Sequence, residues 1–200
     1  LDIQDMWPET LLQNKFIRNK FLIFLISKMC NFSYSNANHI LTNSYGFKKL
    51  LIKKGIKKNK ITTIYNWSNL EIIKNKKINF KFPIDLDNSF KIIYAGNIGE
   101  AQSLYSVIQA ASIINKTKYK ISFIFIGEGI HLNKLKNTVN STGIKNVKFF
   151  KSVPMEEIDC ILRKADALLV HLKDLPIFQI TIPSKIQSYI ATGKPILAAV

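Results

Sequence analysis

The clearest pattern in the chain is the alternation of short apolar runs with amphipathic stretches from Lys91 onward. Five runs contain few polar residues and predict buried strands: Ile92–Ala95, Ile121–Ile126, Val147–Phe150, Ala167–His171 and Ile196–Val200. Helical stretches separate them, at about 102–114, 130–139, 154–164 and 184–192. Such strands predict a parallel sheet covered on both faces, a doubly wound α/β domain. Sheets of this kind bind ligands at the carboxyl ends of their strands.

The first 86 residues follow a less regular pattern, which predicts a helix-rich region with two short strands. Leu11–Met29 is apolar with interspersed basic residues. It predicts a helix that either packs in a core or lies on a membrane surface. A second helix is expected to begin at Ser44, a typical N-cap residue, and to end at Gly55. The two expected strands are His39–Thr42 and Ile61–Tyr65.

Composition adds a strong positive charge to this picture. The 200 residues carry a formal net charge of +16, from 29 basic and 13 acidic residues. The stretch Lys48–Lys81 is especially rich in lysine, with Glu71 as its one acidic residue. Three interpretations stay open: a solvated lysine face that reflects an AT-rich genome, an anionic membrane surface, or nucleic acid. Nucleic acid is the least favoured, because Arg18 and Arg163 are the only arginines.

Composition also excludes several classes of protein. A hydrophobic content of 47% excludes a disordered chain. No apolar run approaches the ~20 residues of a membrane-spanning helix. Cys30 and Cys160 are too few for a disulfide framework, and we expect packing thiols in a reducing compartment. The chain begins at Leu1 without a signal peptide, and we expect it to be a fragment of a longer protein.

Two glycine turns follow predicted strands and could approach a phosphate. Gly96 and Gly99 bracket the turn after the first strand, where backbone N–H groups could meet an anion at a helix N-terminus. A plain turn explains this spacing about as well, since it matches neither GxGxxG nor a P-loop. The segment Gly127-Glu128-Gly129 forms a similar turn after the second strand.

A helix start is predicted beside the same sheet edge. Ser184 and Gln187 have the spacing of a capping box, which would place the first amides of a helix and Lys185 near the glycine turns. An ordinary helix cap is the simpler explanation of this motif alone. Three such segments at one edge favour a ligand site.

These segments together carry a family resemblance. Their order and spacing are those of family 4 glycosyltransferases of the GT-B fold: Tyr94-Ala95-Gly96-Asn97-Ile98-Gly99, Ile126-Gly127-Glu128-Gly129, Pro183-Ser184-Lys185 and Gly193-Lys194-Pro195. The chain resembles the branch that adds amino sugars in bacterial O-antigen and capsule assembly. Asp5-Met6-Trp7-Pro8-Glu9 and Asn66-Trp67 are similar to segments of that branch.

The resemblance implies two Rossmann-like domains. Residues 1–86 would hold the C-terminal part of the acceptor-side domain and a linker at about 69–89. Residues 87–200 would hold the donor domain, incomplete at its C-terminus. The resemblance also implies the donor-binding residues, with the diphosphate at Gly96–Gly99 and the nucleobase near Lys151–Pro154: Gly96, Asn97, Ile98, Gly99, Gly127, Glu128, Val153, Pro183, Ser184, Lys185, Gln187 and Ser188.

The chain departs from the family pattern at two places. Many members carry a Glu-x7-Glu pair, where this chain has Ile180 and Ser188. The wider family often has His-Asp where this chain has Gln4-Asp5. Asp5 and Glu9 are therefore the remaining polar candidates for catalysis.

No metal site is expected from the sequence. Asp85-Leu86-Asp87 matches a DxD motif but falls in the expected linker, and we interpret it as a chance match. His39, His131 and His171 are widely spaced and lack neighbouring ligands.

The resemblance implies a retaining, metal-independent glycosyltransferase without a cofactor. Its donor would be a nucleotide sugar, UDP-linked and carrying an N-acetylated amino sugar. Its acceptor would be a lipid-linked saccharide in surface polysaccharide biosynthesis. The protein would be cytoplasmic, with peripheral association at the inner face of the cell membrane. An inactive GT-B scaffold and a basic nucleic-acid-binding module remain as alternatives.

Overall fold

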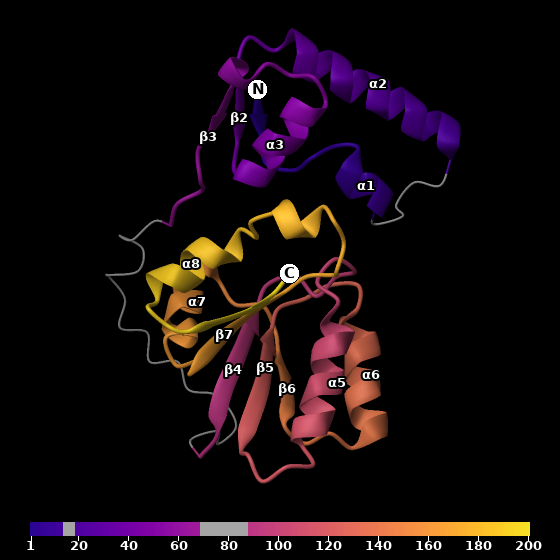
Figure 1. Ribbon diagram of the computed structural model, residues 1–200. Helices are drawn as coiled ribbons and strands as arrows, with labels where there is room; N and C mark the ends of the chain where they lie inside the picture. The colour runs from indigo at the N-terminus through magenta and orange to yellow at the C-terminus, as the bar shows by residue number, and fades with distance from the viewer. Residues whose placement is uncertain (14–18, 69–87) are drawn as a thin grey trace. The chain divides into compact units, whose positions relative to one another are not determined.

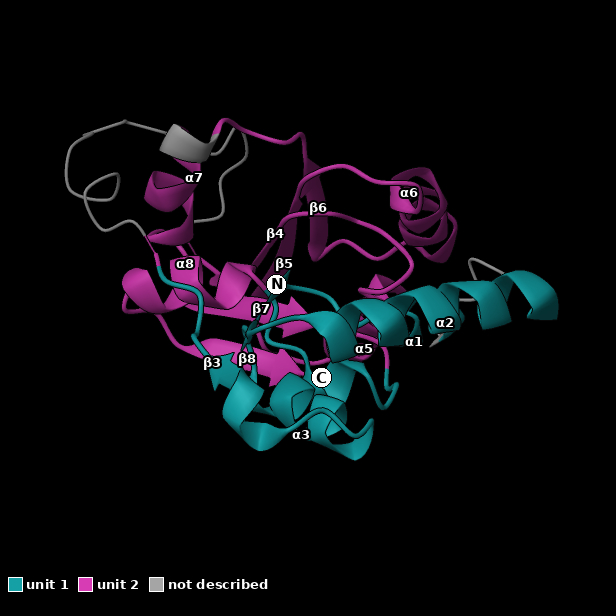
Figure 2. Cartoon of the chain, turned by 90° about the horizontal axis from the view of Figure 1, so that it is seen from above, with its two compact units in different colours: residues 1–67, 174–183 teal, residues 68–173, 184–200 magenta. Residues whose placement is uncertain are grey.

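The computed structural model describes residues 1–13, 19–68 and 88–200, which belong to two compact units (Figure 1). Unit 1 comprises Leu1–Trp67 and Asp174–Pro183, and unit 2 comprises Ser68–Lys173 and Ser184–Val200 (Figure 2). Residues 174–183, which the sequence pattern assigned to the second domain, group with unit 1. The expected linker lies outside the described residues except for residues 88–89, and Asp85-Leu86-Asp87 also lies outside them.

Unit 2 is built on a five-stranded parallel sheet in the order β6-β5-β4-β7-β8. Its strands are β4 (Phe90–Ala95), β5 (Ile121–Ile126), β6 (Val147–Phe150), β7 (Ala167–His171) and β8 (Ile196–Ala199). Three of the five have the predicted bounds; β4 begins earlier and β8 ends earlier than predicted. The strand order reverses beside β4, which pairs with β5 on one side and β7 on the other.

Helices cover both faces of this sheet (Figure 1). The helices α5 (Leu104–Ile114) and α6 (Leu132–Thr142) pack on one face, and α7 (Met155–Leu162) and α8 (Lys185–Ala191) on the other. Alternation along β4 explains the two cores, since Ile92 and Tyr94 enter one and Ile93 and Ala95 the other. The expected α/β class of the GT-B type, with a doubly wound parallel Rossmann-like sheet, is confirmed.

Unit 1 contains a three-stranded parallel sheet in the order β1-β2-β3. Its elements are β1 (Asp2–Ile3), α1 (Glu9–Gln13), α2 (Lys20–Asn36), β2 (Ile40–Thr42), α3 (Tyr45–Lys53), the 3-10 helix η1 (Lys58–Lys60) and β3 (Ile61–Thr63). The single helix predicted over Leu11–Met29 is wrong in its bounds: Asn19 caps α2, which runs on to Asn36. Residues 14–18 lie outside the described residues.

Unit 1 also includes the 3-10 helix η2 (Phe178–Ile180) from far along the chain. Ser44 caps α3 as predicted, accepting from the Phe47 amide at 3.0 Å, and its hydroxyl donates to the Ile180 carbonyl at 2.7 Å. A Cβ on Gly46 would lie 2.4 Å from the Ile180 Cβ, so only glycine permits this contact. Ser44 and Gly46 thus join segments that are remote in sequence.

Candidate functional site

The two glycine turns of unit 2 pack against each other at the carboxyl edge of its sheet. A Cβ on Gly127 (φ +144°) would lie 2.0 Å from the Gly96 carbonyl oxygen, and one on Gly129 (φ +153°) would lie 2.4 Å from the Ile98 carbonyl oxygen. No side chain fits at either position. The glycines therefore serve close contact between two backbone segments.

This packing uses the amides that were expected to bind a phosphate. The Gly96 amide donates to the Ile126 carbonyl at 2.9 Å, and the Ile98 amide donates to the Glu128 carbonyl at 2.7 Å. The Gly99 amide donates to Gln102 Oε1 at 3.1 Å. These three amides therefore have partners within the protein, and the Ile98 side chain is fully buried in the core. Diphosphate contact at Gly96–Gly99 stays a prediction.

Lys185, the first residue of α8, directs its amine into this edge. Its Nζ lies 3.7 Å from the centre of the Tyr94 ring, and a Cβ on Gly96 would be 3.1 Å from the same atom. The amine is shielded from solvent and has no hydrogen-bond partner among the described residues. Burial lowers the pKa of Lys185 to about 7.

A buried amine without a counter-ion is costly for a fold, and groups with such displaced pKa values cluster at functional sites. Lys185 also lies where the strand order reverses, the position at which open α/β sheets bind ligands. The prediction that Lys185 stands beside the glycine turn at Gly96 therefore agrees with the geometry. An anion bound here would supply the missing partner.

Two tyrosines that the sequence analysis did not single out hold Lys185 in place. The Tyr94 ring lies under the amine, and its hydroxyl donates to the Asn97 carbonyl at 2.5 Å. The Ala95 amide donates to the Tyr189 hydroxyl at 2.9 Å, which fastens α8 to the end of β4. Tyr94 opens a segment that carried the family resemblance, whereas Tyr189 looks like an ordinary core position, so only Tyr94 had a sequence signal.

The capping box predicted at the start of α8 is absent. Ser184 has helical backbone angles (φ −57°, ψ −26°), and its side chain caps no amide. An N-cap residue needs an extended backbone to place its oxygen over the next turn, which explains the failure. The Gln187 Oε1 atom is shielded and accepts no hydrogen bond from the described residues, and Ser188 is half-buried.

The remaining donor-side residues lie near the turn after β5. The Gly127 amide donates to the Phe150 carbonyl at 3.2 Å, and Ser152 donates to Glu128 Oε1 at 2.8 Å. Val153 packs against the core that contains Ala95. The structure thus brings Glu128 and the segment Lys151–Pro154 together, whereas Pro183 belongs to unit 1. Nucleobase contact by this segment stays a prediction.

Glu100 forms a second polar cluster after the Gly96–Gly99 turn. Its carboxylate pairs with Lys173, and His131 Nε2 lies 3.0 Å from its Oε2. The hydrogen bond from Lys173 holds the pKa of Glu100 below its ordinary value. Lys173 is therefore neutralised within the protein, unlike Lys185.

The two catalytic candidates lie in unit 1 and differ in their surroundings. Asp5 is exposed in the segment after β1. Glu9 Oε1 forms an ion pair with Lys54 Nζ at 2.6 Å, which joins α1 to the end of α3. This pairing gives Glu9 a structural role, and a catalytic role for either residue stays a prediction.

Three amide side chains meet at the carboxyl edge of the unit 1 sheet. Gln4 Oε1 accepts from Asn43 Nδ2 at 3.2 Å and from Asn66 Nδ2 at 3.1 Å. The Gln4 carbonyl accepts from the same Asn43 amide at 3.0 Å. Asn66 belongs to a segment that carried the family resemblance, and Gln4 stands where the chain departs from the family pattern, whereas Asn43 has no sequence signal. The network fixes the orientation of the Gln4 amide.

Across residues 1–13, 19–68 and 88–200, no three His, Cys, Asp or Glu side chains gather in a way that could hold a metal ion.

Comparison with known proteins agrees with this architecture. Residues 74–199 match the family model of glycosyl transferases group 1. The chain is 24% identical to probable glycosyltransferase WbjE of Pseudomonas aeruginosa over 200 residues, covering 98% of this chain and 49% of that protein. It is 27% identical over 163 residues to WcaI of Escherichia coli K12, named a putative colanic acid biosynthesis glycosyl transferase, covering 79% of this chain and 39% of that protein.

A solved structure with a similar fold is Anabaena HepE in complex with UDP-glucose, at a TM-score of 0.71 and 15% identity. The match covers 98% of this chain and 52% of HepE. The chain thus spans about half the length of the relatives that it matches. The family match over residues 74–199 covers more than half of the chain and agrees with the parallel sheet of unit 2: the chain belongs to the group 1 glycosyl transferases.

Proposed function

We propose that this chain is the nucleotide-sugar-binding part of a glycosyltransferase that acts in surface polysaccharide biosynthesis. The observation that carries the proposal is the buried, unpaired amine of Lys185 beside Gly96 at the switch point of the sheet. A nucleoside diphosphate supplies the counter-charge that this amine lacks. In the transfer step, negative charge develops on the leaving diphosphate, and a protonated Lys185 would stabilise it.

The finer parts of the proposal are a UDP-linked donor with an N-acetylated amino sugar and a lipid-linked acceptor. The UDP-glucose complex of HepE supports a uridine nucleotide, and the name of WcaI supports a polysaccharide product. We further propose retention of configuration at the sugar and catalysis without a metal ion. Unchanged turnover in excess EDTA and an NMR assignment of the product anomer test these two points on the longest available form of the protein.

Binding of UDP and uridine to the 200-residue chain tests the donor site. Calorimetry should show that UDP binds at least about tenfold more tightly than uridine, because a charge-assisted contact contributes ~1.5–3 kcal/mol. Lys185→Met should remove this difference and leave uridine affinity unchanged. Lys136→Met, at an exposed position on α6, is the matched control and should change neither value.

Equal affinities for UDP and uridine in the unchanged chain would contradict the proposal. So would a Lys185→Met variant that keeps the preference for UDP. Salt-sensitive binding of a single-stranded oligonucleotide without binding of UDP would instead favour the nucleic-acid alternative. UDP binding without sugar transfer in the longer protein would favour the inactive scaffold.

Association with an anionic membrane surface is the last part of the proposal. The helix α2 exposes six large apolar side chains: Phe21, Leu22, Phe24, Leu25, Met29 and Phe32. Lys28 Nζ lies 5.5 Å from the centre of the Phe24 ring, so basic and apolar groups share this surface. In the described part of the chain, no helix is long and apolar enough to cross a membrane.

Sedimentation with anionic vesicles tests the membrane contact. Binding should weaken as salt rises but keep a salt-resistant fraction, because inserted apolar groups are not screened. Phe21→Ser with Phe24→Ser should remove that fraction, whereas Ile113→Ser, an equally exposed apolar position on α5, should not. No binding at low salt would contradict membrane association.

A further inference from the structure

The amino edge of the unit 2 sheet holds a polar cavity that the proposed donor site does not use. Its volume is about 430 Å³, and it lies at the starts of β4, β5 and β6 beside the end of α5. Its lining includes an aromatic residue, three lysines and two amide residues: Tyr119, Lys120, Lys145, Lys148, Asn115 and Asn146. The carboxyl ends of the strands, where Lys185 lies, are at the opposite edge.

Three lysines are among the described residues that line this cavity, and none of those described residues is Asp or Glu. Lys120, Lys145 and Lys148 each contribute to the wall, and none forms an ion pair with a described Asp or Glu side chain. Lysines that share a wall repel one another, so an anion bound among them would relieve that repulsion. The charge of the cavity therefore favours an anionic ligand.

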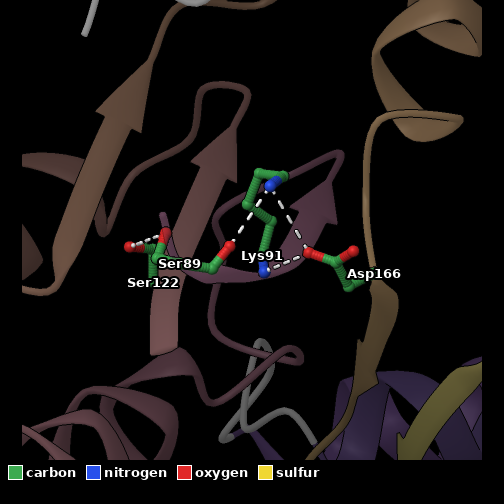
Figure 3. Close-up of polar contacts among 4 residues, drawn as sticks. All are labelled: Ser89, Lys91, Ser122 and Asp166. Atoms are coloured by element: carbon green, nitrogen blue, oxygen red, sulfur yellow. Dashed lines mark hydrogen bonds and ion pairs between the residues drawn. The ribbon is translucent and has the colours of Figure 1, made fainter. Parts of the chain in front are cut away.

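Asp166, a described acidic residue at the same edge, already has partners within the protein, as Figure 3 shows. Asp166, immediately before β7, accepts from the Lys91 amide at 2.7 Å, and its Oδ2 lies 3.5 Å from Lys91 Nζ. Lys91 Nζ also donates to the Ser89 carbonyl at 3.2 Å, and Ser122 donates to the Ser89 hydroxyl at 2.8 Å. Lys91 is thus neutralised internally, and Asp166 does not serve the three cavity lysines.

Two amide side chains in the wall are held in defined orientations. Asn146 Nδ2 donates to the Ala111 carbonyl at 3.1 Å, which leaves its Oδ1 as an acceptor without a donor among the described residues. Asn115 Oδ1 accepts a hydrogen bond from the backbone amide of Lys145 at 3.4 Å. The Asn115 Nδ2 group takes no part in that bond. The Asn146 Oδ1 atom is shielded from solvent, so Asn146 shapes the wall of the cavity. Asn115 is exposed, and its side chain is the amide that a ligand hydroxyl can reach.

Tyr119 adds an aromatic surface to the lysines and amides. Its side chain is 65% exposed and lines the cavity. An exposed aromatic ring can cover the apolar face of a sugar ring, while the Asn115 amide binds a hydroxyl group and the lysines bind the negative charge. The three kinds of group are complementary to one class of small molecule.

From this arrangement we infer that the amino-edge cavity binds an acidic saccharide unit, a sugar ring that carries a carboxylate or a phosphate. The site is separate from the donor site and does not depend on the proposed function. A glycan or sugar phosphate bound here would be held by unit 2 while Lys185 remains available at the opposite edge.

Chemical-shift mapping by NMR on the ¹⁵N-labelled 200-residue chain tests this inference with four probes: D-glucuronate, glucose 1-phosphate, glucose and inorganic phosphate. The two acidic sugars should shift the amides of Tyr119, Asn146 and Lys148. Glucose and inorganic phosphate should bind at least about tenfold more weakly, since each lacks one of the two recognised features. Shifts confined to the Gly96–Gly99 turn would overturn the inference.

Variants separate charge from sugar recognition. Lys145→Glu with Lys148→Glu should weaken glucuronate binding by at least about tenfold, whereas Lys57→Glu with Lys58→Glu, an equal change of charge at exposed positions in unit 1, should not. Tyr119→Ala removes an exposed side chain, so the fold should persist while glucuronate binding weakens. Equal losses in the control pair, unaltered binding in Tyr119→Ala, or equal affinity for glucose and glucuronate would each overturn the inference.

Discussion

The two edges of the unit 2 sheet place a lysine in opposite situations. At the amino edge, Lys91 is bound by Asp166 and the Ser89 carbonyl (Figure 3). At the carboxyl edge, Lys185 is shielded over Tyr94, and no described residue accepts its proton. Lys91 stabilises the folded chain through its internal partners, whereas the buried charge of Lys185 destabilises it. Such a difference indicates that the partner of Lys185 comes from outside the protein.

Removing the internal partner of Lys91 should have the largest effect on stability. Asp166→Asn leaves the Lys91 ammonium without its counter-charge and should lower the free energy of unfolding by about 2–3 kcal/mol. Urea denaturation measures this change. Asp159→Asn is the control, because its ion pair with exposed Arg163 should contribute less than about 0.5 kcal/mol. Equal losses of stability in the two variants would contradict the expected difference between these two carboxylates.

Replacing Lys185 should act in the opposite direction. Its folded-state pKa of about 7 lies below the ordinary 10.5, so the buried charge destabilises the folded chain at low pH. This penalty is full below about pH 7 and is relieved as the pH rises toward 10.5. Lys185→Met should therefore raise the free energy of unfolding by about 1–3 kcal/mol at pH 6, and by less at pH 10.

Denaturation of Lys185→Met at both pH values measures this gain, with Lys136→Met as the control. A loss of stability at pH 6 would show that Lys185 is a structural residue. For Lys185→Met we expect higher stability together with a lost preference for UDP. Such a trade-off is common where a functional residue lowers the stability of the fold.

Two serines at helix starts should show a smaller contrast. Ser44→Ala should cost about 1 kcal/mol, because the hydroxyl caps α3 and also donates to the Ile180 carbonyl. Ser184→Ala should change the free energy of unfolding by less than about 0.5 kcal/mol, because Ser184 caps no amide. Thermal unfolding of the two variants checks this ordering, and the reverse order would be inconsistent with the observed cap geometry.

Local sequence patterns predicted the sheet of unit 2 well, because its strands are short apolar runs separated by amphipathic stretches. The bounds of β5, β6 and β7 follow directly from such runs. The position of Lys185 beside Gly96 was also predictable, from the rule that ligand-binding groups gather at the carboxyl edge.

Non-local contacts account for what the sequence did not reveal. The amides of Gly96 and Ile98 are satisfied by residues some thirty positions away, so the turn alone suggested free donors. Asn43 reaches Gln4 across 39 positions, and Ser44 reaches Ile180 across 136. The capping box at Ser184 failed because backbone angles, which the residue type does not determine, decide whether a serine can cap.

The most direct test of the account is an NMR titration of the Lys185 side chain in the presence and absence of UDP. Without UDP, the amine should titrate near pH 7, far below the ordinary 10.5. With saturating UDP, the pKa should rise by at least about one unit, because the diphosphate stabilises the charged form. A Lys185 pKa near 10.5 without UDP, or a pKa that UDP does not change, would contradict the claim that the partner of Lys185 is an external anion.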